Sequence, residues 1–146
     1  MTAAVRYLQL PQEEVHLPDL VGMRPFRAVV LIREMVSNGW RNRVSDWLVA
    51  SGCLYALAWG EDCSAWDDAV DWANIDAFDT KPMPPERFVV TTWHEDETIE
   101  EVFWFATHCA EHPTVPLQSD LILDISSANR EADATQAWAS ALADGS

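Results

Sequence analysis

The sequence predicts an α/β fold, a three-layer sandwich in which helices cover both faces of a short, mainly parallel sheet. Four apolar segments rich in β-branched residues recur along the chain, and helical patterns separate them. This alternation is typical of β-α-β units with right-handed crossovers. The segments are residues 27–32, 53–59, 87–93 and 121–125. If the four segments are numbered along the chain, we expect them to pair in the order 2-1-3-4, which makes a Rossmann-like sheet.

The first and third helical patterns have clear ends. Val36, Trp40 and Val44 recur at helical spacing, and Gly52 follows as a typical residue just beyond a helix C-terminus. The third pattern begins with Thr98 and Glu101, the two members of a capping box. Both segments are therefore expected to be amphipathic helices with one buried face.

The second helical pattern is expected to begin near Ser64. We interpret Ser64 as the N-cap and Asp67 as its partner in a short version of the capping box. Asp67, Asp68 and Asp71 would then lie early in the helix, where the helix dipole favours negative charge.

The length of 146 residues suits one domain. We expect an irregular N-terminal segment over residues 1–25, packed on the domain, in which residues 5–10 have the pattern of a short edge strand. The α/β domain spans residues 26–126. Residues 127–146 form a polar, alanine-rich tail with the pattern of one last helix.

The charge balance is strongly acidic, with 24 acidic residues against 9 basic ones and a formal charge of −15. Such a surface repels nucleic acid and anionic membranes and attracts basic partners. No run of 18 apolar residues and no signal peptide is found. The three cysteines lack zinc-site spacing. We therefore expect a cytoplasmic protein with free thiols, of which Cys53 and Cys109 lie in the core.

Carboxylates follow each of the four predicted strands. Because the carboxyl ends of parallel strands share one edge of a sheet, these side chains are expected to meet there. Carboxylate oxygens suit Mg²⁺ or Mn²⁺. The candidate metal ligands are Glu34, Glu61, Glu95 and Asp124. No phosphate-binding glycine loop follows the first strand, so no nucleotide cofactor is expected.

Two further residues near this edge are candidate catalytic groups. Cys63 precedes a predicted helix, whose dipole lowers the pKa of a thiol. His94 could serve as its base, or as a general base on its own. The alternative is that His94 is a hydrogen-bonded loop residue and that the neighbouring carboxylates hold the thiol protonated.

Large aromatic residues lie beside the expected buried faces of two helices. They are Trp72 in the second helix and Trp104 and Phe105 in the third. Aromatic residues in such positions suggest a second contact, either within the chain or with another protein. We therefore expect these residues to contact a protein partner or another subunit of a homo-oligomer.

Two segments, SGCLYALAWGEDCSAWDDA at residues 51–69 and TTWHEDE at residues 91–97, resemble a family of small uncharacterised bacterial proteins. This family is known only as a domain of unknown function. The resemblance covers residues 26–126. It implies a bacterial source and supplies no activity, substrate or catalytic residue.

Three hypotheses of function follow. The first is an acidic binding or regulatory module that docks a basic protein, as immunity, antitoxin and accessory defence proteins do. The second is a small metal-dependent hydrolase with its site at the carboxyl edge of the sheet. The third is a sensor that holds a cationic or aromatic molecule between Trp59 and Trp93.

Overall fold

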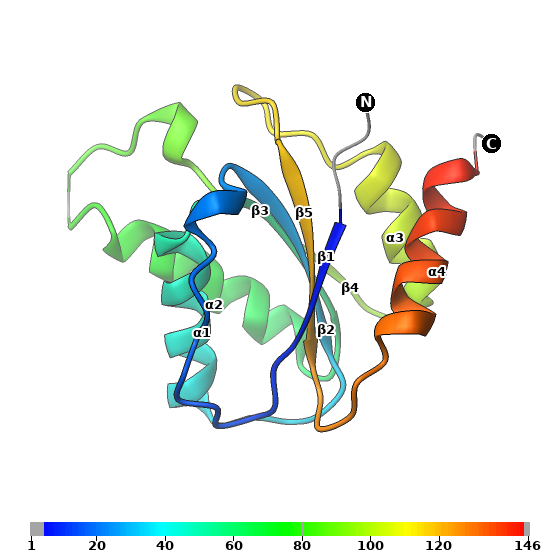
Figure 1. Cartoon of the computed structure of the whole chain (residues 1–146). Coiled ribbons are helices and arrows are strands. Elements are labelled where there is room, and N and C mark those ends of the chain that lie inside the picture. The colour runs from blue at the N-terminus through cyan, green and yellow to red at the C-terminus, as the bar shows by residue number, and fades with distance from the viewer. Residues whose placement is uncertain (1–4, 80, 145–146) are drawn as a thin grey trace.

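The computed structural model describes residues 5–79 and 81–144 and has three layers, with helices on both faces of a parallel sheet (Figure 1). The predicted fold class is therefore confirmed. The strands are β1 (Val5–Gln9), β2 (Phe26–Ile32), β3 (Cys53–Gly60), β4 (Val90–His94) and β5 (Ser119–Ile125). The helices are α1 (Asn38–Ala50), α2 (Cys63–Asp76), α3 (Ile99–His108) and α4 (Glu131–Ala143), with short 3-10 turns at Val21–Met23 and Pro85–Arg87.

The strand order is β1-β5-β2-β3-β4, and every neighbouring pair is parallel. The predicted order 2-1-3-4 is wrong, because β5 lies beside β2 and β4 lies at the edge. Burial explains the difference. Leu121, Ile122 and Leu123 of β5 are fully buried, whereas Thr92 and Trp93 of β4 are partly or largely exposed. The predicted order would have put the apolar strand at the edge and the polar one inside.

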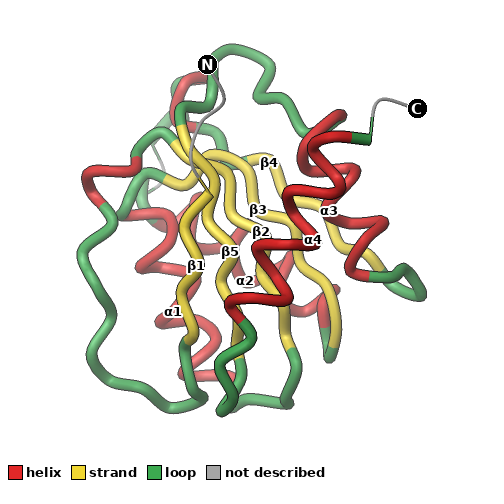
Figure 2. Tube along the Cα trace, turned by 45° about the vertical axis from the view of Figure 1, so that its right-hand side comes forward, coloured by secondary structure: helices red, strands yellow, loops and turns green. Residues whose placement is uncertain are grey.

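Figure 2 shows helices on both faces of the sheet. Alternate residues of the central strands enter two separate cores, one on each face. On one face, Trp40 of α1 and Trp66 of α2 meet edge to face, with ring centroids 6.4 Å apart. On the other, Phe103 of α3 and Trp138 of α4 meet at 5.3 Å. Each large apolar side chain buried in this way stabilises the fold by roughly 1.5–3 kcal/mol.

The start of α3 agrees with the prediction from the sequence, and the start of α2 differs from it. The side chain of Thr98 accepts from the backbone N–H of Glu101, whose side chain accepts from Thr98 in return, so the predicted capping box is confirmed. The box predicted at Ser64 is wrong. The N-cap of α2 is Asp62, in a left-handed conformation and without a side-chain cap bond. Asp67 is thus the fifth residue of the helix, too late to cap it.

Both ends of the described chain are part of the three-layer fold. Strand β1 extends the sheet along β5, and α4 packs beside α3. Residues 1–4 and 145–146 of the predicted N-terminal segment and tail lie outside the described residues. Among the helices within 5–79 and 81–144, none combines the length and the apolar character that a membrane crossing needs.

Gly60 ends β3 with φ +105°, and a Cβ built on it would lie 2.1 Å from the carbonyl oxygen of Ile32. We predict that Gly60→Ala lowers the free energy of unfolding by about 2–4 kcal/mol, because the backbone of central strand β2 would have to move. Gly39 in α1 is the matched control, since no atom lies within 4 Å of its added Cβ. Gly39→Ala should be neutral or stabilising by up to about 1 kcal/mol. Urea unfolding of both variants checks this, and equal effects would contradict it.

Candidate functional site

The carboxylate of Asp124 lies at the carboxyl edge of the sheet and is fully buried. It accepts hydrogen bonds from the Tyr7 hydroxyl at 2.5 Å and from Nε of Arg33 at 3.1 Å. Burial, together with the bond to Asp124, raises the pKa of Tyr7 to about 12. Asp124 therefore links β1, β5 and the end of β2, and its bonds are made within the chain.

The other three predicted metal ligands lie on the loops after β2, β3 and β4. Glu34 accepts from the backbone N–H and hydroxyl of Ser127, at 3.3 and 3.0 Å, and joins two loops. Glu61 and Glu95 are exposed. No three of these four carboxylates have ligand atoms within 4.8 Å of one another in the described part of the chain. The carboxyl edge is thus acidic without gathering these groups into one ligand shell.

His94 is buried, and both of its ring nitrogens have partners. Nδ1 lies 3.0 Å from a carboxylate oxygen of Glu97, and Nε2 lies 2.9 Å from the hydroxyl of Thr92. The ring also meets Phe105 edge to face at 5.2 Å. A base that acts on a substrate or on Cys63 would first have to give up one of these two hydrogen bonds.

Cys63 opens α2 and is buried. Burial raises the pKa of its thiol; a hydrogen bond from the His94 backbone lowers it, and the negative charge of Glu95 raises it. The net shift is upward, opposite to the activation that a helix N-terminus can give. The thiol is therefore held in its protonated, weakly nucleophilic form.

The end of β4 and its loop surround a small hollow of about 270 Å³, lined by Trp59, Gly60 and residues 94–97. Trp59 faces α3 and α4, and its indole N–H donates to the carbonyl of Glu97 at 2.7 Å. Trp93 alternates with His94 along β4 and points to the other face of the sheet. The sensor hypothesis is therefore wrong in its geometry, because the two indoles cannot enclose one molecule.

The predicted partner-binding residues also lie on opposite faces of the sheet. Trp72 lies on α2 and is 63% exposed. Trp104 and Phe105 lie on α3, across the sheet, and are only partly exposed. Trp104 stacks on His108 with ring centroids 4.9 Å apart. The two α3 residues have contacts inside the chain, and Trp72 is the one that projects from its helix.

Trp72 is one of four exposed apolar side chains that lie on α2, on β4 and just before β4. Helix α2 packs against β4. We call these four side chains the α2–β4 surface. Its members are Trp72, Ile75, Phe88 and Trp93, with exposed fractions of 63, 51, 47 and 52%. Sequence reasoning missed Ile75 and Phe88. The outward position of Ile75, three residues after Trp72 on the helix, was the available signal.

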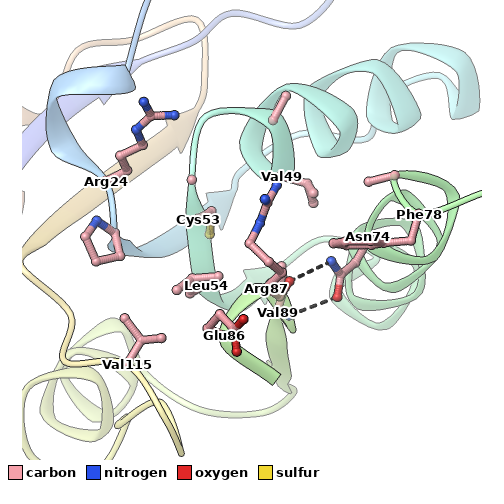
Figure 3. Close-up of a pocket in the computed structure, with 14 residues that line it drawn as sticks. Arg24, Val49, Cys53, Leu54, Asn74, Phe78, Glu86, Arg87, Val89 and Val115 are labelled. Atoms are coloured by element: carbon pink, nitrogen blue, oxygen red, sulfur yellow. Dashed lines mark hydrogen bonds between the residues drawn. The ribbon is translucent and has the colours of Figure 1, made fainter. Parts of the chain in front are cut away.

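A cavity of about 400 Å³ lies at the amino ends of β3 and β4, where it is lined by Arg87 and Val89, the chain neighbours of Phe88 (Figure 3). Its apolar lining includes Val49, Leu54, Phe78, Val89 and Val115. No local sequence pattern indicates this cavity, because several segments far apart in the chain combine to form it.

Polar groups hold the walls of this cavity in place. Asn74 of α2 donates to the carbonyl of Arg87 at 3.1 Å and accepts from the N–H of Val89 at 2.9 Å. The Arg87 guanidinium lies over the Phe78 ring, 5.5 Å from its centroid. Arg24 stands on the side of the cavity opposite Phe78 (Figure 3). The loop before β4 is thereby fixed to α2.

Three carboxylates lie together on α2 beside β4. Asp67, Asp68 and Asp71 each offer an oxygen within 4.8 Å of the other two. Asp71 accepts from the Thr91 hydroxyl of β4 at 2.8 Å. Burial, followed by the charge of Asp71, raises the pKa of Asp67 to about 6. The spacing of four residues between Asp67 and Asp71 places them on one helix face. This spacing could have predicted the cluster, but Asp67 was interpreted as a capping residue instead.

These features define a three-layer α/β domain with an acidic carboxyl edge and an exposed aromatic surface at one edge of the sheet. The chain belongs to the family described as "Domain of unknown function (DUF7684)", whose model matches residues 5–141. The match reaches beyond the 26–126 of the resemblance and includes β1 and most of α4. Comparisons with curated proteins and with solved structures find no match.

Thiol accessibility tests the state of Cys63. Cys109, which we expected in the core, is exposed, because α3 ends at His108 and Cys109 forms its C-cap. We predict that iodoacetamide at neutral pH modifies Cys109 in the folded protein and leaves Cys53 and Cys63 intact, as mass spectrometry would show. In the unfolded protein, iodoacetamide should modify all three cysteines. Modification of native Cys63 as fast as Cys109 would instead support an activated nucleophile.

Tyr7→Phe tests the network around Asp124. The variant leaves the buried carboxylate without its hydroxyl donor, so the free energy of unfolding should fall by about 1–3 kcal/mol. Tyr55 is the matched control, because it is buried and its hydroxyl has no hydrogen bond to a described residue. Tyr55→Phe should change stability by less than about 0.5 kcal/mol. Equal losses in urea unfolding would show that the Tyr7–Asp124 bond contributes nothing specific.

Proposed function

We propose that this domain is a protein-binding module that docks a basic partner on the α2–β4 surface. The observation that carries the proposal is the exposure of four large apolar side chains, two of them tryptophans, on α2, on β4 and in the loop just before β4. Single exposed apolar residues are ordinary on protein surfaces, whereas a group of them marks an interaction site. Tryptophan is also the residue type most enriched among binding hot spots.

The charge of the chain supports a basic partner. With a formal charge of −15, the domain attracts positive surfaces at long range and repels a second copy of itself. Exposed carboxylates flank the aromatic residues, among them Asp68 and Asp76 on α2 and Glu95 and Asp96 after β4. Lysine and arginine side chains can pair with such carboxylates and lie over indole rings.

The adjoining cavity supplies the shape that a strong interface needs. Hot-spot residues usually fill well-packed pockets near the centre of an interface. The cavity of about 400 Å³ has an apolar lining and lies next to Phe88 of the α2–β4 surface. An aliphatic or aromatic side chain of the partner would fill it, while basic residues of the partner meet the carboxylates along α2.

The cellular setting is part of the same proposal. The three cysteines are free, which supports a reducing cytoplasm. The resemblance to bacterial proteins supports a bacterial source. A small acidic domain that docks a basic protein would act there as immunity, antitoxin and accessory defence proteins do.

Display of random peptides against the purified domain tests the proposal without knowledge of the partner. We predict that selected peptides are rich in lysine and arginine and contain an apolar anchor, because charge and cavity both select them. The double variant Trp72→Ala/Trp93→Ala should weaken their binding at least tenfold. Leu142→Ala is the control, since Leu142 is exposed on α4 across the sheet. It should bind like the unmodified domain.

Three results would contradict the proposal. Selected peptides could be acidic, or their affinity could be the same for the double variant as for the unmodified domain. Alternatively, light scattering could show a dimer that the double variant abolishes, which would make a second copy of the chain the occupant of the surface.

A further inference from the structure

The carboxylate of Asp67 is the most buried charged group on α2. The residue is 6% exposed, and its Oδ2 atom is buried without a hydrogen-bond partner in the structure. Among the described residues, the only other buried side-chain atom of this kind is Nε of Arg41. A buried carboxylate oxygen without a partner is costly, because it loses its hydration and gains nothing in exchange.

The neighbours of Asp67 increase this cost. Asp68 and Asp71 bring two more carboxylates within 4.8 Å, and like charges this close repel one another. None of the ion pairs formed by the described residues includes any of the three. The hydroxyl of Thr91 donates to one oxygen of Asp71 at 2.8 Å, which orients that side chain and leaves the charge in place.

We propose that Asp67, Asp68 and Asp71 form a binding site for one divalent cation that prefers oxygen ligands. Ca²⁺ binds oxygens at about 2.3–2.6 Å, so opposite ligands on it lie about 4.6–5.2 Å apart. Three oxygens that all lie within 4.8 Å of one another fit on such a shell with little movement. Mg²⁺ and Mn²⁺ need a slightly tighter arrangement of the same groups.

The three side chains differ in a way that suits such a site. Asp67 is buried against β4, Asp71 is half-buried and held by Thr91, and Asp68 is exposed. Asp67 and Asp71 would form the fixed inner side of the site. Asp68 would lie on its solvent side, where the cation enters and keeps its waters. Carboxylates held by second-shell hydrogen bonds are typical of metal ligands.

The inference goes beyond the proposed function and is tested on the isolated domain, without a partner. Protein freed of metal by chelation is titrated with Ca²⁺, Mg²⁺ or Mn²⁺ by calorimetry, at constant ionic strength. We expect one saturable site and, at a hundredfold excess over Kd, a rise in melting temperature of at least about 3 °C. Mn²⁺ should broaden the amide NMR signals of residues 67–71 and 91 before any others.

Substitutions locate the site. Asp71→Asn and Asp68→Asn should each weaken binding at least tenfold, and Asp68 is exposed, so its variant should fold normally. Glu95→Gln is the matched control, because it removes one exposed carboxylate from the nearby loop and should leave affinity unchanged. It also tests whether the carboxyl edge holds the metal instead.

Three outcomes would overturn the inference. One is the absence of saturable binding at 10 mM of each cation, which would mean that Asp67 and Asp71 share a proton. Another is equal weakening in Glu95→Gln and Asp68→Asn, which would indicate only general screening of the acidic surface. The last is Mn²⁺ broadening centred on the carboxyl-edge loops.

Discussion

Burial of β5, β2 and β3 on both faces is the constraint on which the rest of the structure depends. Their side chains alternate between two cores, one under α1 and α2 and the other under α3 and α4. A strand that is apolar on both faces must lie inside the sheet, and β5 therefore inserts between β1 and β2. The short, more polar β4 is left at the edge, where one of its sides has no neighbouring strand.

This placement of β4 leaves large apolar side chains exposed at one edge of the sheet. Strand β4 ends the sheet, and Trp93 on it and Phe88 just before it are exposed. The same position leaves Asp67 buried between α2 and β4 without a basic neighbour. The exposed aromatic residues and the carboxylate cluster thus share one origin, the use of a polar strand to end the sheet.

The layers could be predicted from the sequence because each depends on local pattern. Apolar runs marked β2, β3 and β5, and the capping box at Thr98 marked the start of α3. Strand order depends on pairing between distant segments, which local pattern does not contain. The carboxyl-edge residues were placed at the correct edge, but Asp124 binds Tyr7 and Arg33 rather than joining Glu95. The cavity and the orphaned oxygen of Asp67 arise only from tertiary contacts.

We propose that protein partners bind this domain on α2 and β4, at the β4 edge of the sheet. Amide hydrogen exchange, with and without a bound peptide or protein partner, tests it most directly. We expect new protection over residues 68–79 and 86–96, with α4 and the loop after β5 unchanged. Protection centred on α3 and α4, or on the carboxyl-edge loops after β2 and β5, would contradict it.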